Sequence, residues 1–423
     1  MKKLIVVFGL CLMVSNASGS GFSIYEFGGR ASAMAGAAVA RPWDASTIFY
    51  NPAGLAFLRG TQFYGGTTLI FPAGKFIGAA PLFDATVYKS KSAIYTPIGL
   101  YFSHKLSDRL GVGLGVTNPF GLGVKWYDDF PGRGISKDAQ LQSFYISPVF
   151  GYKISDRFSI GGGPDIVFSS VKLVRHVYLF ESEGSPGYEV GVASLEGNSK
   201  LTLGFSAAAM YRSDRFGFGV LYRHSVTNEY NQGEVTFTIF DDLTVPNIAA
   251  VARKLLVNQN VRTAITFPNI LSVGAYYRLL ERFGIEVDYL WFNWSVFDAI
   301  ELEFDDARLN QTVPEDYRDS WQLRVGAHYE VNDRLSLRAG YIYDRTPQPV
   351  ESVSPLLPDA TRHDFSFGVG YRFDKYQIDL GYMLVAFDER STVVDGEGKN
   401  HYRFDGTYTS RADLVFASFG IQF

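Results

Sequence analysis

The sequence predicts an all-β fold: a transmembrane antiparallel β-barrel of about 14 strands with a small N-terminal hatch inside its lumen. Three observations predict it. The chain begins with a secretory signal, its aromatic-rich segments alternate between apolar and polar residues, and one kind of tight turn recurs six times. Alternating segments of about ten residues behind a signal peptide are typical of barrels that cross an outer membrane.

Residues 1–19 have the pattern of a signal peptide. Lys2 and Lys3 give a positive start, an apolar run of 11 residues follows, and small residues come next. The small-x-small rule places cleavage after Ala17 or after Gly19. The apolar run is too short to cross a bilayer as a helix. The alternative interpretation is a buried helix of a cytosolic protein.

Composition excludes several classes of function. The single cysteine, Cys11, lies in the predicted signal peptide, so the mature chain has no disulfide, thiolate metal site or cysteine nucleophile. A formal net charge of −4 makes the chain a poor candidate for binding nucleic acid. The chain contains 35 Phe, 26 Tyr and 43 Gly, yet no apolar run after the signal is long enough for a membrane helix. These aromatic residues are therefore assigned to strands.

A short acidic-basic turn separates pairs of alternating segments. Its six copies are spaced by 48, 58, 67, 52 and 41 residues, which leaves room for two strands and a longer loop in each interval. Six turns flanked by strands predict twelve strands, and one near 62–71 and one near 409–423 complete fourteen. Short turns at one end and long loops at the other match the periplasmic and extracellular ends of such barrels. The turns are Ser107-Asp108-Arg109, Ser155-Asp156-Arg157, Ser213-Asp214-Arg215, Leu280-Glu281-Arg282, Asn332-Asp333-Arg334 and Phe373-Asp374-Lys375.

The alternation also assigns side chains to the two faces of the wall. Trp321, Leu323 and Val325 share one face, whereas Gln322 and Arg324 share the other. Charged side chains are costly in hydrocarbon, so the second set is placed in the lumen. A surface strand of a soluble sandwich is the alternative, and it does not explain six such hairpins. The same rule places four charged side chains in the lumen: Arg324, Arg338, Glu286 and Asp288. It places three apolar side chains in contact with lipid: Phe365, Phe367 and Val369.

Residues 20–60 do not alternate and form the predicted hatch, whereas residues 61–423 form the predicted barrel. The hatch is rich in small residues, which would let it pack inside a narrow lumen. Near its end Asn51 precedes Pro52, a combination that initiates turns because proline fixes its own φ and restricts the residue before it. A fourteen-strand barrel lies between the packed eight-strand case and the open porins, so its lumen can hold a plug.

Residues Asp44–Leu55 resemble the N-terminal hatch of the FadL family of outer-membrane transporters. The family's hallmark Asn-Pro-Ala falls on Asn51, Pro52 and Ala53. Other similar stretches follow in order over essentially the whole mature chain. The resemblance implies a fourteen-strand barrel closed by a hatch, in agreement with the turn count, and a channel for hydrophobic small molecules. The similar stretches begin at Thr117, Asn293, Arg338 and Leu357.

The loop between about Asp241 and Asn260 is the first candidate binding site. Pro246 could begin a helix, and in the family loops with such helices form a capture groove. The alternative is a helix that packs only on the barrel rim. The predicted apolar face of this helix consists of Ile248, Val251, Leu255 and Leu256. The basic residues beside that face, Arg253 and Lys254, could meet a carboxylate.

The resemblance also implies a tighter pocket inside the barrel, at the N-terminus of the hatch. Phe22 and Ile24 would line it, and the inward Arg324 and Arg338 are the candidates for contact with an acid headgroup. The alternative is that both arginines only pair across the lumen with the carboxylates Glu286 and Asp288.

The third candidate is Asn118-Pro119-Phe120-Gly121, which interrupts the third predicted strand. Proline cannot donate to a β-ladder, and a break in a barrel wall leaves a gap or a kink. The family uses a kink in its third strand as a lateral door into the outer leaflet. A simple end of the strand at a loop is the alternative.

The sequence predicts no enzyme, cofactor or metal site, because its six histidines are scattered. Two glycine runs, at 111–115 and 161–163, lie within strands and are not phosphate loops. A general porin lacks a hatch with an Asn-Pro-Ala turn, and an adhesin would carry longer loops.

The predicted function is therefore passive uptake by a monomer in the outer membrane of a Gram-negative bacterium, in contact with lipid and lipopolysaccharide. Long-chain fatty acids are the expected ligands, although the family also includes channels for aromatic hydrocarbons such as toluene. The final Phe423 resembles the terminal aromatic signal of the barrel assembly machinery.

Overall fold

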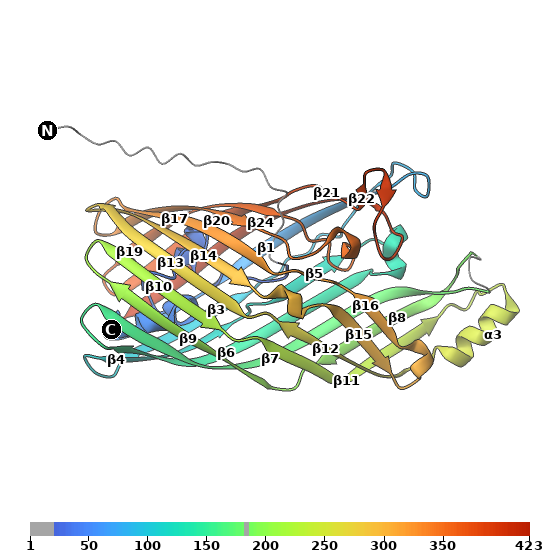
Figure 1. Cartoon of the computed structure of the whole chain (residues 1–423), viewed down its shortest axis with the longest axis horizontal. Helices are drawn as coiled ribbons and strands as arrows, with labels where there is room; N and C mark the ends of the chain where they lie inside the picture. The colour runs from blue at the N-terminus through green and yellow to red at the C-terminus, as the bar shows by residue number, and fades with distance from the viewer. Residues whose placement is uncertain (1–20, 182–185) are drawn as a thin grey trace.

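The computed structural model describes residues 21–181 and 186–423 as a closed antiparallel β-barrel (Figure 1). The predicted signal peptide lies outside the described residues. Fourteen strands pair in chain order, and β1 (Thr61–Gly78) pairs with β24 (Gly406–Gln422) to close the wall. That last register runs from Gln62 opposite Gln422 to Gly78 opposite Gly406. The predicted strand number is confirmed.

Several wall strands consist of two consecutive elements. The strands in order are β1; β3 (Ile98–Lys105); β4 (Leu110–Thr117) with β5 (Gly121–Lys125); β6 (Asp138–Lys153); β7 (Phe158–Leu179); β8 (Tyr188–Asn198) with β9 (Thr202–Arg212); β10 (Phe216–Arg223) with β11 (Val226–Ile239); β12 (Gln259–Phe267) with β13 (Ile270–Leu280); β14 (Phe283–Phe292) with β15 (Ala299–Phe304); β16 (Gln311–Pro314) with β17 (Ser320–Glu330); β18 (Leu335–Asp344); β19 (Arg362–Phe373); β20 (Tyr376–Phe387); and β24. Short loop strands are β2 (Val87–Lys89), β21 (Arg390–Ser391), β22 (Val393–Val394) and β23 (Glu397–Gly398).

All six predicted tight turns connect neighbouring strands at one end of the barrel, the end where the C-terminus lies (Figure 1). The longer loops and α3 (Pro246–Leu255) lie at the other end. In the described residues, no helix is both long enough and apolar enough to cross a membrane.

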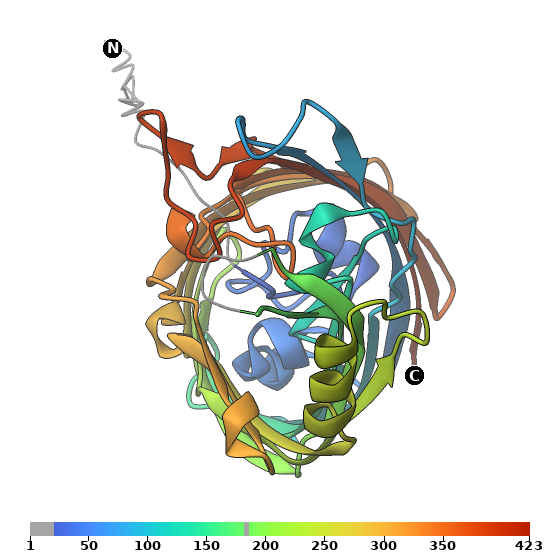
Figure 2. The same cartoon turned by 90° about the vertical axis from the view of Figure 1, so that its right-hand side faces the viewer.

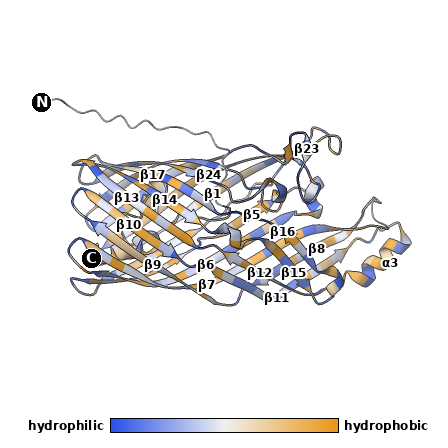
Figure 3. Ribbon diagram, viewed as in Figure 1, coloured by the Kyte–Doolittle hydropathy of each residue, from blue (hydrophilic) through white to orange (hydrophobic). Residues whose placement is uncertain are grey.

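The predicted faces of the wall are also confirmed. Arg324 and Arg338 point inward and are 3% and 4% exposed, whereas Phe365 and Phe367 point outward and are 51% and 59% exposed. Hydrophobic and hydrophilic residues alternate along many strands of the ribbon (Figure 3). Successive side chains of a strand point to opposite faces, so a pattern of period two places one set in the lumen.

The N-terminal segment, residues 21–60, lies inside the barrel (Figure 2). It contains α1 (Gly29–Ala33), α2 (Thr47–Tyr50) and the 3₁₀ helix η1 (Pro52–Phe57). Wall glycines allow its backbone to come close. A Cβ atom on Gly111 would lie 2.4 Å from the carbonyl oxygen of Leu55, and one on Gly161 would lie 2.6 Å from the nitrogen of Ala53. The other 3₁₀ helices are η2 (Pro131–Gly134), η3 (Trp294–Val296), η4 (Ala307–Leu309) and η5 (Val350–Ser352).

Candidate ligand-binding site

The Asn51-Pro52-Ala53 turn fixes the N-terminal segment to itself and to the wall. Asn51 is fully buried, and its Oδ1 accepts a 3.1 Å hydrogen bond from the nitrogen of Ala53 at the start of η1. Its Nδ2 donates to the carbonyl oxygens of Val39, at 2.8 Å, and Ala209 on β9, at 3.2 Å. Pro52 occupies the first turn of the 3₁₀ helix, where no backbone N–H is needed. The motif is therefore a structural anchor.

The two inward carboxylates of β14 hold the same segment. Asp288 accepts hydrogen bonds from the nitrogens of Ala38, at 2.9 Å, and Val39, at 3.1 Å. Glu286 accepts one of 2.6 Å from the nitrogen of Ala40. Buried backbone N–H groups need such partners, and the wall supplies them here in place of secondary structure.

The two predicted headgroup arginines lie beside the N-terminal segment. Neither of them lines the two cavities that Phe22 borders inside the barrel. Arg324 stacks over the ring of Tyr25, 4.1 Å from its centroid, and donates to the carbonyl oxygen of Gly36 at 3.2 Å. Arg338 forms a 2.7 Å ion pair with Asp379. The suggested pairing of Arg338 with Glu286 or Asp288 across the lumen is therefore wrong, because its carboxylate partner lies on β20, on the far side of the neighbouring strand β19. Ligand binding by either arginine stays a prediction.

The wall is interrupted at the strand break, residues 118–120, between β4 and β5. β3 pairs with β4 as far as Gly99 opposite Thr117, and no pairing of β3 with β5 follows in the described residues. The side chain of Asn118 replaces part of the missing ladder. Its Oδ1 accepts from the nitrogen of Ile98 at 3.0 Å, and its Nδ2 donates to the carbonyl oxygen of Ser143 at 2.7 Å. The predicted break in the third strand is thus present.

The first described residues of the N-terminal segment bond directly to this break. The nitrogen of Ile24 donates to the carbonyl oxygen of Pro119 at 2.9 Å, and the nitrogen of Gly121 donates to the carbonyl oxygen of Phe22 at 3.0 Å. Proline has no N–H to donate, but its carbonyl oxygen is free to accept from the segment. The start of the segment is therefore paired with the one stretch of the third strand that leaves the sheet.

A larger cavity of about 390 Å³ begins at these residues. Buried Phe22 and half-buried Ile24 line it together with the strand break, as do Tyr95 and Ile94 before β3. Phe22 is 5% exposed and Ile94 is 61% exposed, so the lining extends from the lumen to the outer surface of the wall. The expected lumen position of Phe22 and Ile24 agrees with this geometry.

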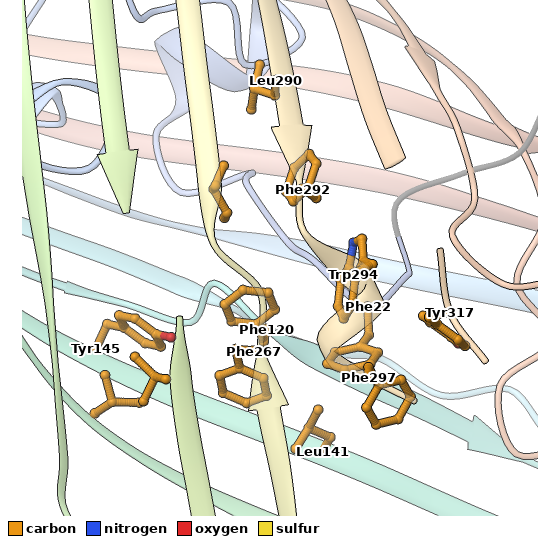
Figure 4. Close-up of a cluster of buried hydrophobic side chains, with 13 residues drawn as sticks. Phe22, Phe120, Leu141, Tyr145, Phe267, Leu290, Phe292, Trp294, Phe297 and Tyr317 are labelled. Atoms are coloured by element: carbon orange, nitrogen blue, oxygen red, sulfur yellow. The ribbon is translucent and has the colours of Figure 1, made fainter. Parts of the chain in front are cut away.

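A smaller cavity of about 120 Å³ lies next to the larger one and has an almost wholly apolar lining. Both cavities share Phe22, Leu122, Gln140, Leu141 and Leu357. The ring of Phe22 contributes to the boundary between them and belongs to an aromatic cluster (Figure 4). Its ring centroid lies between 4.7 and 6.2 Å from those of four neighbours: Trp294, Phe297, Phe267 and Phe120.

Each cationic side chain that lines either cavity has a carboxylate partner. In the larger cavity Arg362 pairs with Asp344 at 2.7 Å, and in the smaller one Lys172 pairs with Glu196 at 2.5 Å. An ion pair already satisfies the charge of a cation, which weakens its attraction for a second carboxylate. The remaining pairs, all in the larger cavity, are Lys91–Asp128, Lys125–Asp138 and Arg411–Asp413.

Three carboxyl groups of the N-terminal segment and the loops also line the cavities: Glu26, Asp359 and Glu315. Burial raises the pKa of all three, that of Asp359 to about 6 and that of Glu315 to about 8. A low-dielectric environment disfavours the charged carboxylate and so favours the neutral acid. At neutral pH the Glu315 carboxyl is therefore mostly protonated, whereas that of Asp359 is mostly ionised.

The predicted loop helix is present as α3, but its predicted face is partly wrong. Ile248, Ala252 and Leu256 are buried, whereas Val251 is 50% exposed. The buried side packs on the rim formed by β7, β8 and β11, including Val190. Arg253 and Lys254 are exposed, and Leu255 is half-buried. A capture role for this helix stays a prediction.

Sequence reasoning missed most of the cavity lining. Trp294 and Phe297 follow β14, in a stretch that resembles the family, yet nothing in their spacing placed them against Phe22. Asp359 and Glu315 come from loops with no periodic pattern. Their positions depend on loop packing inside the barrel.

Known proteins resemble the chain over nearly its whole length. The model of the family described as outer membrane protein transport protein (OMPP1/FadL/TodX) matches residues 10–423. A long-chain fatty acid transport protein of Escherichia coli O6:H1 is 23% identical over 422 residues, which cover 94% of this chain and 93% of that protein. Outer membrane protein P1 of Haemophilus influenzae is 22% identical over 462 residues, which cover 97% of this chain and 97% of that protein.

Two solved structures share the fold. A FadL homologue of Pseudomonas aeruginosa has a TM-score of 0.83 at 21% identity, covering 96% of this chain and 100% of that chain. The toluene transporter TodX of Pseudomonas putida has a TM-score of 0.72 at 18% identity, covering 96% and 99%. The family match, the closed barrel and the outer-membrane relatives agree. The chain belongs to the OMPP1/FadL/TodX family of transport proteins of the Gram-negative outer membrane.

Proposed function

We propose that the protein is a passive channel that takes up neutral hydrophobic small molecules and releases them sideways through the strand break. The observation that carries this proposal is the larger cavity, whose lining joins buried Phe22 to exposed Ile94 past residues 118–120. A hydrophobic ligand gains nothing from a water-filled pore, whereas a largely apolar cavity that reaches the wall offers it a path to lipid.

The route begins in the smaller cavity, passes Phe22 and ends at the break. Residues 25–53 are held to the wall at many points, such as the 2.6 Å bond from Tyr25 Oη to Asp364. Residues 21–24 instead bond mainly to the strand break and to Asp359. A shift of residues 21–24 would therefore move Phe22 and the break together. Burial stabilises a hydrophobic ligand by about 0.8 kcal/mol per methylene-sized group, so release requires such a weakening of the cavity.

The paired cations support a neutral ligand. A carboxylate in either cavity would have to displace Asp344 from Arg362 or Glu196 from Lys172. Glu26 and Asp359 lie in the lining of the larger cavity and would oppose an acid wherever they are ionised.

Long-chain fatty acids are the second candidate ligands. Two observations favour them: the relative from Escherichia coli is a long-chain fatty acid transport protein, and Arg362 lines the larger cavity. In this alternative a carboxylate would exchange with Asp344 at the guanidinium.

The test is uptake of labelled toluene and labelled oleate by cells that lack their own transporter, with and without this gene. Gene-dependent uptake of toluene, and not of oleate, is the expected result. Gene-dependent uptake of oleate alone would show that the ligand is a fatty acid and not a neutral molecule. If neither ligand enters faster while folded protein is present in the outer membrane, the uptake function itself is wrong.

A further inference from the structure

Residues 90–97, which we call the strap, connect β2 to β3 and border the larger cavity at the wall. The ladder between β1 and β3 ends at Thr67 opposite Ile98, and the strap continues along β1 beyond that point. The nitrogen of Tyr95 donates to the carbonyl oxygen of Ile70 at 3.1 Å, and the nitrogen of Ile70 donates to the carbonyl oxygen of Tyr95 at 2.9 Å. The backbone of Tyr95 is therefore fixed to β1.

The other side of the strap faces β5 and is joined to it only at one end. The nitrogen of Lys91 donates to the carbonyl oxygen of Lys125 at 2.7 Å. In the described part of the chain, no backbone hydrogen bond joins residues 92–97 to residues 118–125. The wall has no β-ladder across this gap, so side chains have to close it.

The ring of Tyr95 crosses the gap and lies against Gly123 of β5. A Cβ atom on Gly123 would overlap Cζ and Oη of Tyr95, so the ring occupies the space that a side chain would need. Gly121 is covered in the same way by Ile24, whose Cδ1 would lie 2.7 Å from a Cβ atom there. One side chain of the strap and one of the N-terminal segment thus cover two neighbouring glycines.

Both glycines face the outside of the wall. Gly121 lies opposite Gln142 of β6, and Gly123 lies opposite Gln140. Both glutamines are exposed, whereas Leu141 between them is buried. Residues directly opposite in an antiparallel pair share a face of the sheet. The ring of Tyr95 therefore lies on the outer side of β5, between the cavity and the surroundings of the barrel.

The exit lies at the height of the lipid-facing apolar band. Leu69 and Phe71 flank Ile70 on β1, and each is 37% exposed on the outer face of the wall. Exposed apolar side chains on this face mark the part of a barrel that contacts the hydrocarbon of the membrane. A ligand that passes Tyr95 therefore enters lipid.

The cavity itself does not restrict the ligand to a single ring. Its volume of about 390 Å³ is more than twice the roughly 150 Å³ of an apolar cavity that accepts benzene. A limit on ligand size therefore has to come from the exit.

We infer that Tyr95 is the outer gate of the lateral exit and sets the size of the neutral ligands that leave through it. The inference rests on the proposed function and adds a specificity-determining residue to it. Ile24 belongs to the segment proposed to move, so a shift of residues 21–24 uncovers Gly121. The ring over Gly123 remains, because its backbone is held by β1, and it has to rotate about its own side-chain bonds. A larger ligand requires a larger displacement of this ring.

The test compares uptake of labelled toluene with that of labelled phenanthrene, a neutral hydrocarbon of three fused rings, in cells that lack their own transporter. Uptake by cells without the gene is subtracted, and the readout is the ratio of the phenanthrene rate to the toluene rate. Differences in the amount of protein between variants cancel in this ratio.

Tyr95→Ala should raise the ratio about tenfold, because the ring no longer has to be displaced. A tenfold change corresponds to about 1.4 kcal/mol in a barrier. This is about half of what full burial of a large apolar side chain contributes, and Tyr95 is half-buried. Tyr95→Phe should keep the native ratio, since the hydroxyl has no hydrogen-bond partner among the described residues. Tyr329→Ala, on the outward face of β17 and 45% exposed, is the matched control.

A second variant makes the gate reversible. Cys11, the only cysteine of the chain, lies in the predicted signal peptide, so Tyr95→Cys places a single thiol in the predicted mature chain. The unmodified variant should behave like Tyr95→Ala. Benzyl methanethiosulfonate attaches a ring to this thiol and should return the ratio toward the native value, and dithiothreitol should reverse the change. The reagent should leave the ratio of the native protein unaltered.

An unchanged ratio in Tyr95→Ala, together with a Tyr95→Cys protein that does not respond to the reagent, would overturn the inference. Toluene uptake by the native protein would still leave the proposed function standing. Equal rises in Tyr95→Phe and Tyr95→Ala would refute the ring as the gate. The reagent experiment decides the matter if Tyr95→Ala does not assemble. Absence of gene-dependent uptake of either compound, with folded protein in the outer membrane, would overturn the proposed function and the inference with it.

Discussion

The backbone nitrogen of Ile24 donates a 2.9 Å hydrogen bond to the carbonyl oxygen of Pro119, which joins the start of the N-terminal segment to the break in the barrel wall. On the other side of the break, the nitrogen of Gly121 donates to Phe22. The element proposed to move and the opening proposed to release the ligand are therefore in direct contact. A change in either one is expected to affect the other.

Filling the strand break should stop uptake. In the double variant Pro119→Val and Gly121→Phe, the new ring meets Ile24, because a Cβ at position 121 already lies 2.7 Å from Cδ1 of that residue. Uptake of labelled toluene should fall to the level of cells without the gene. The amount of protein in the outer membrane should stay normal. Leu114→Phe, on the outward face of β4, is the control, and unchanged uptake in the double variant would refute a lateral exit.

Asn51→Ala should loosen the N-terminal segment. The change removes the bonds to Val39 and Ala209 and leaves their carbonyl oxygens without this partner, at a cost of about 1–3 kcal/mol. We expect a lower unfolding temperature and a higher ion conductance in planar bilayers, where the native protein should be nearly silent. Asn231→Ala, at an exposed site, should change neither property. A silent Asn51→Ala barrel would show that other contacts suffice to keep the lumen closed.

Asp359 should make stability depend on pH. Its folded-state pKa of about 6 is raised by burial above the ordinary value of 3.8, so the folded chain binds the proton more tightly than the unfolded chain. The stability that this proton contributes is present below about pH 4 and is lost as the pH rises through 6. Above pH 6, burial of the charged carboxylate destabilises the fold.

Asp359→Asn should remove this dependence, because an amide oxygen can still accept from Gly21 and Thr346 without carrying charge. Denaturant midpoints of the folded barrel at pH 4.5 and pH 7 provide the measurement. The native protein should lose more stability between these values than the variant does. Equal losses in both proteins would place the titration on other groups.

Phe423→Ala should impair assembly more than stability. Phe423 is 67% exposed, and its backbone nitrogen and carbonyl oxygen already bond to Thr61, so truncation of the ring leaves barrel closure intact. The fraction of heat-modifiable, folded barrel in cells should fall. Phe419→Ala on the same face of β24 should fold normally in cells, and an equal defect in both variants would argue against a special role for the final residue.

The sequence alone determined the parts of the fold that depend on local pattern. Alternation with period two separated Arg324 and Arg338 from Phe365 and Phe367, and the recurring turns set the number of strands. Both signals involve residues close together in the chain, so no knowledge of distant contacts was needed. The Asn51-Pro52 turn and the break at Pro119 were predictable for the same reason, since proline restricts its own backbone and its immediate neighbour.

Only the tertiary structure decided which side chains meet. Arg338 pairs with Asp379, 41 residues away, because β18 and β20 flank β19 and Gly370 of β19 leaves room for the two side chains to meet. Val251 is exposed because packing on the rim sets the rotation of α3 about its axis, which the helical period leaves open. Glu315 and Thr263 share one cavity because a loop folds inward against β12. Such contacts depend on how strands, loops and the helix pack against one another, and no local pattern encodes them.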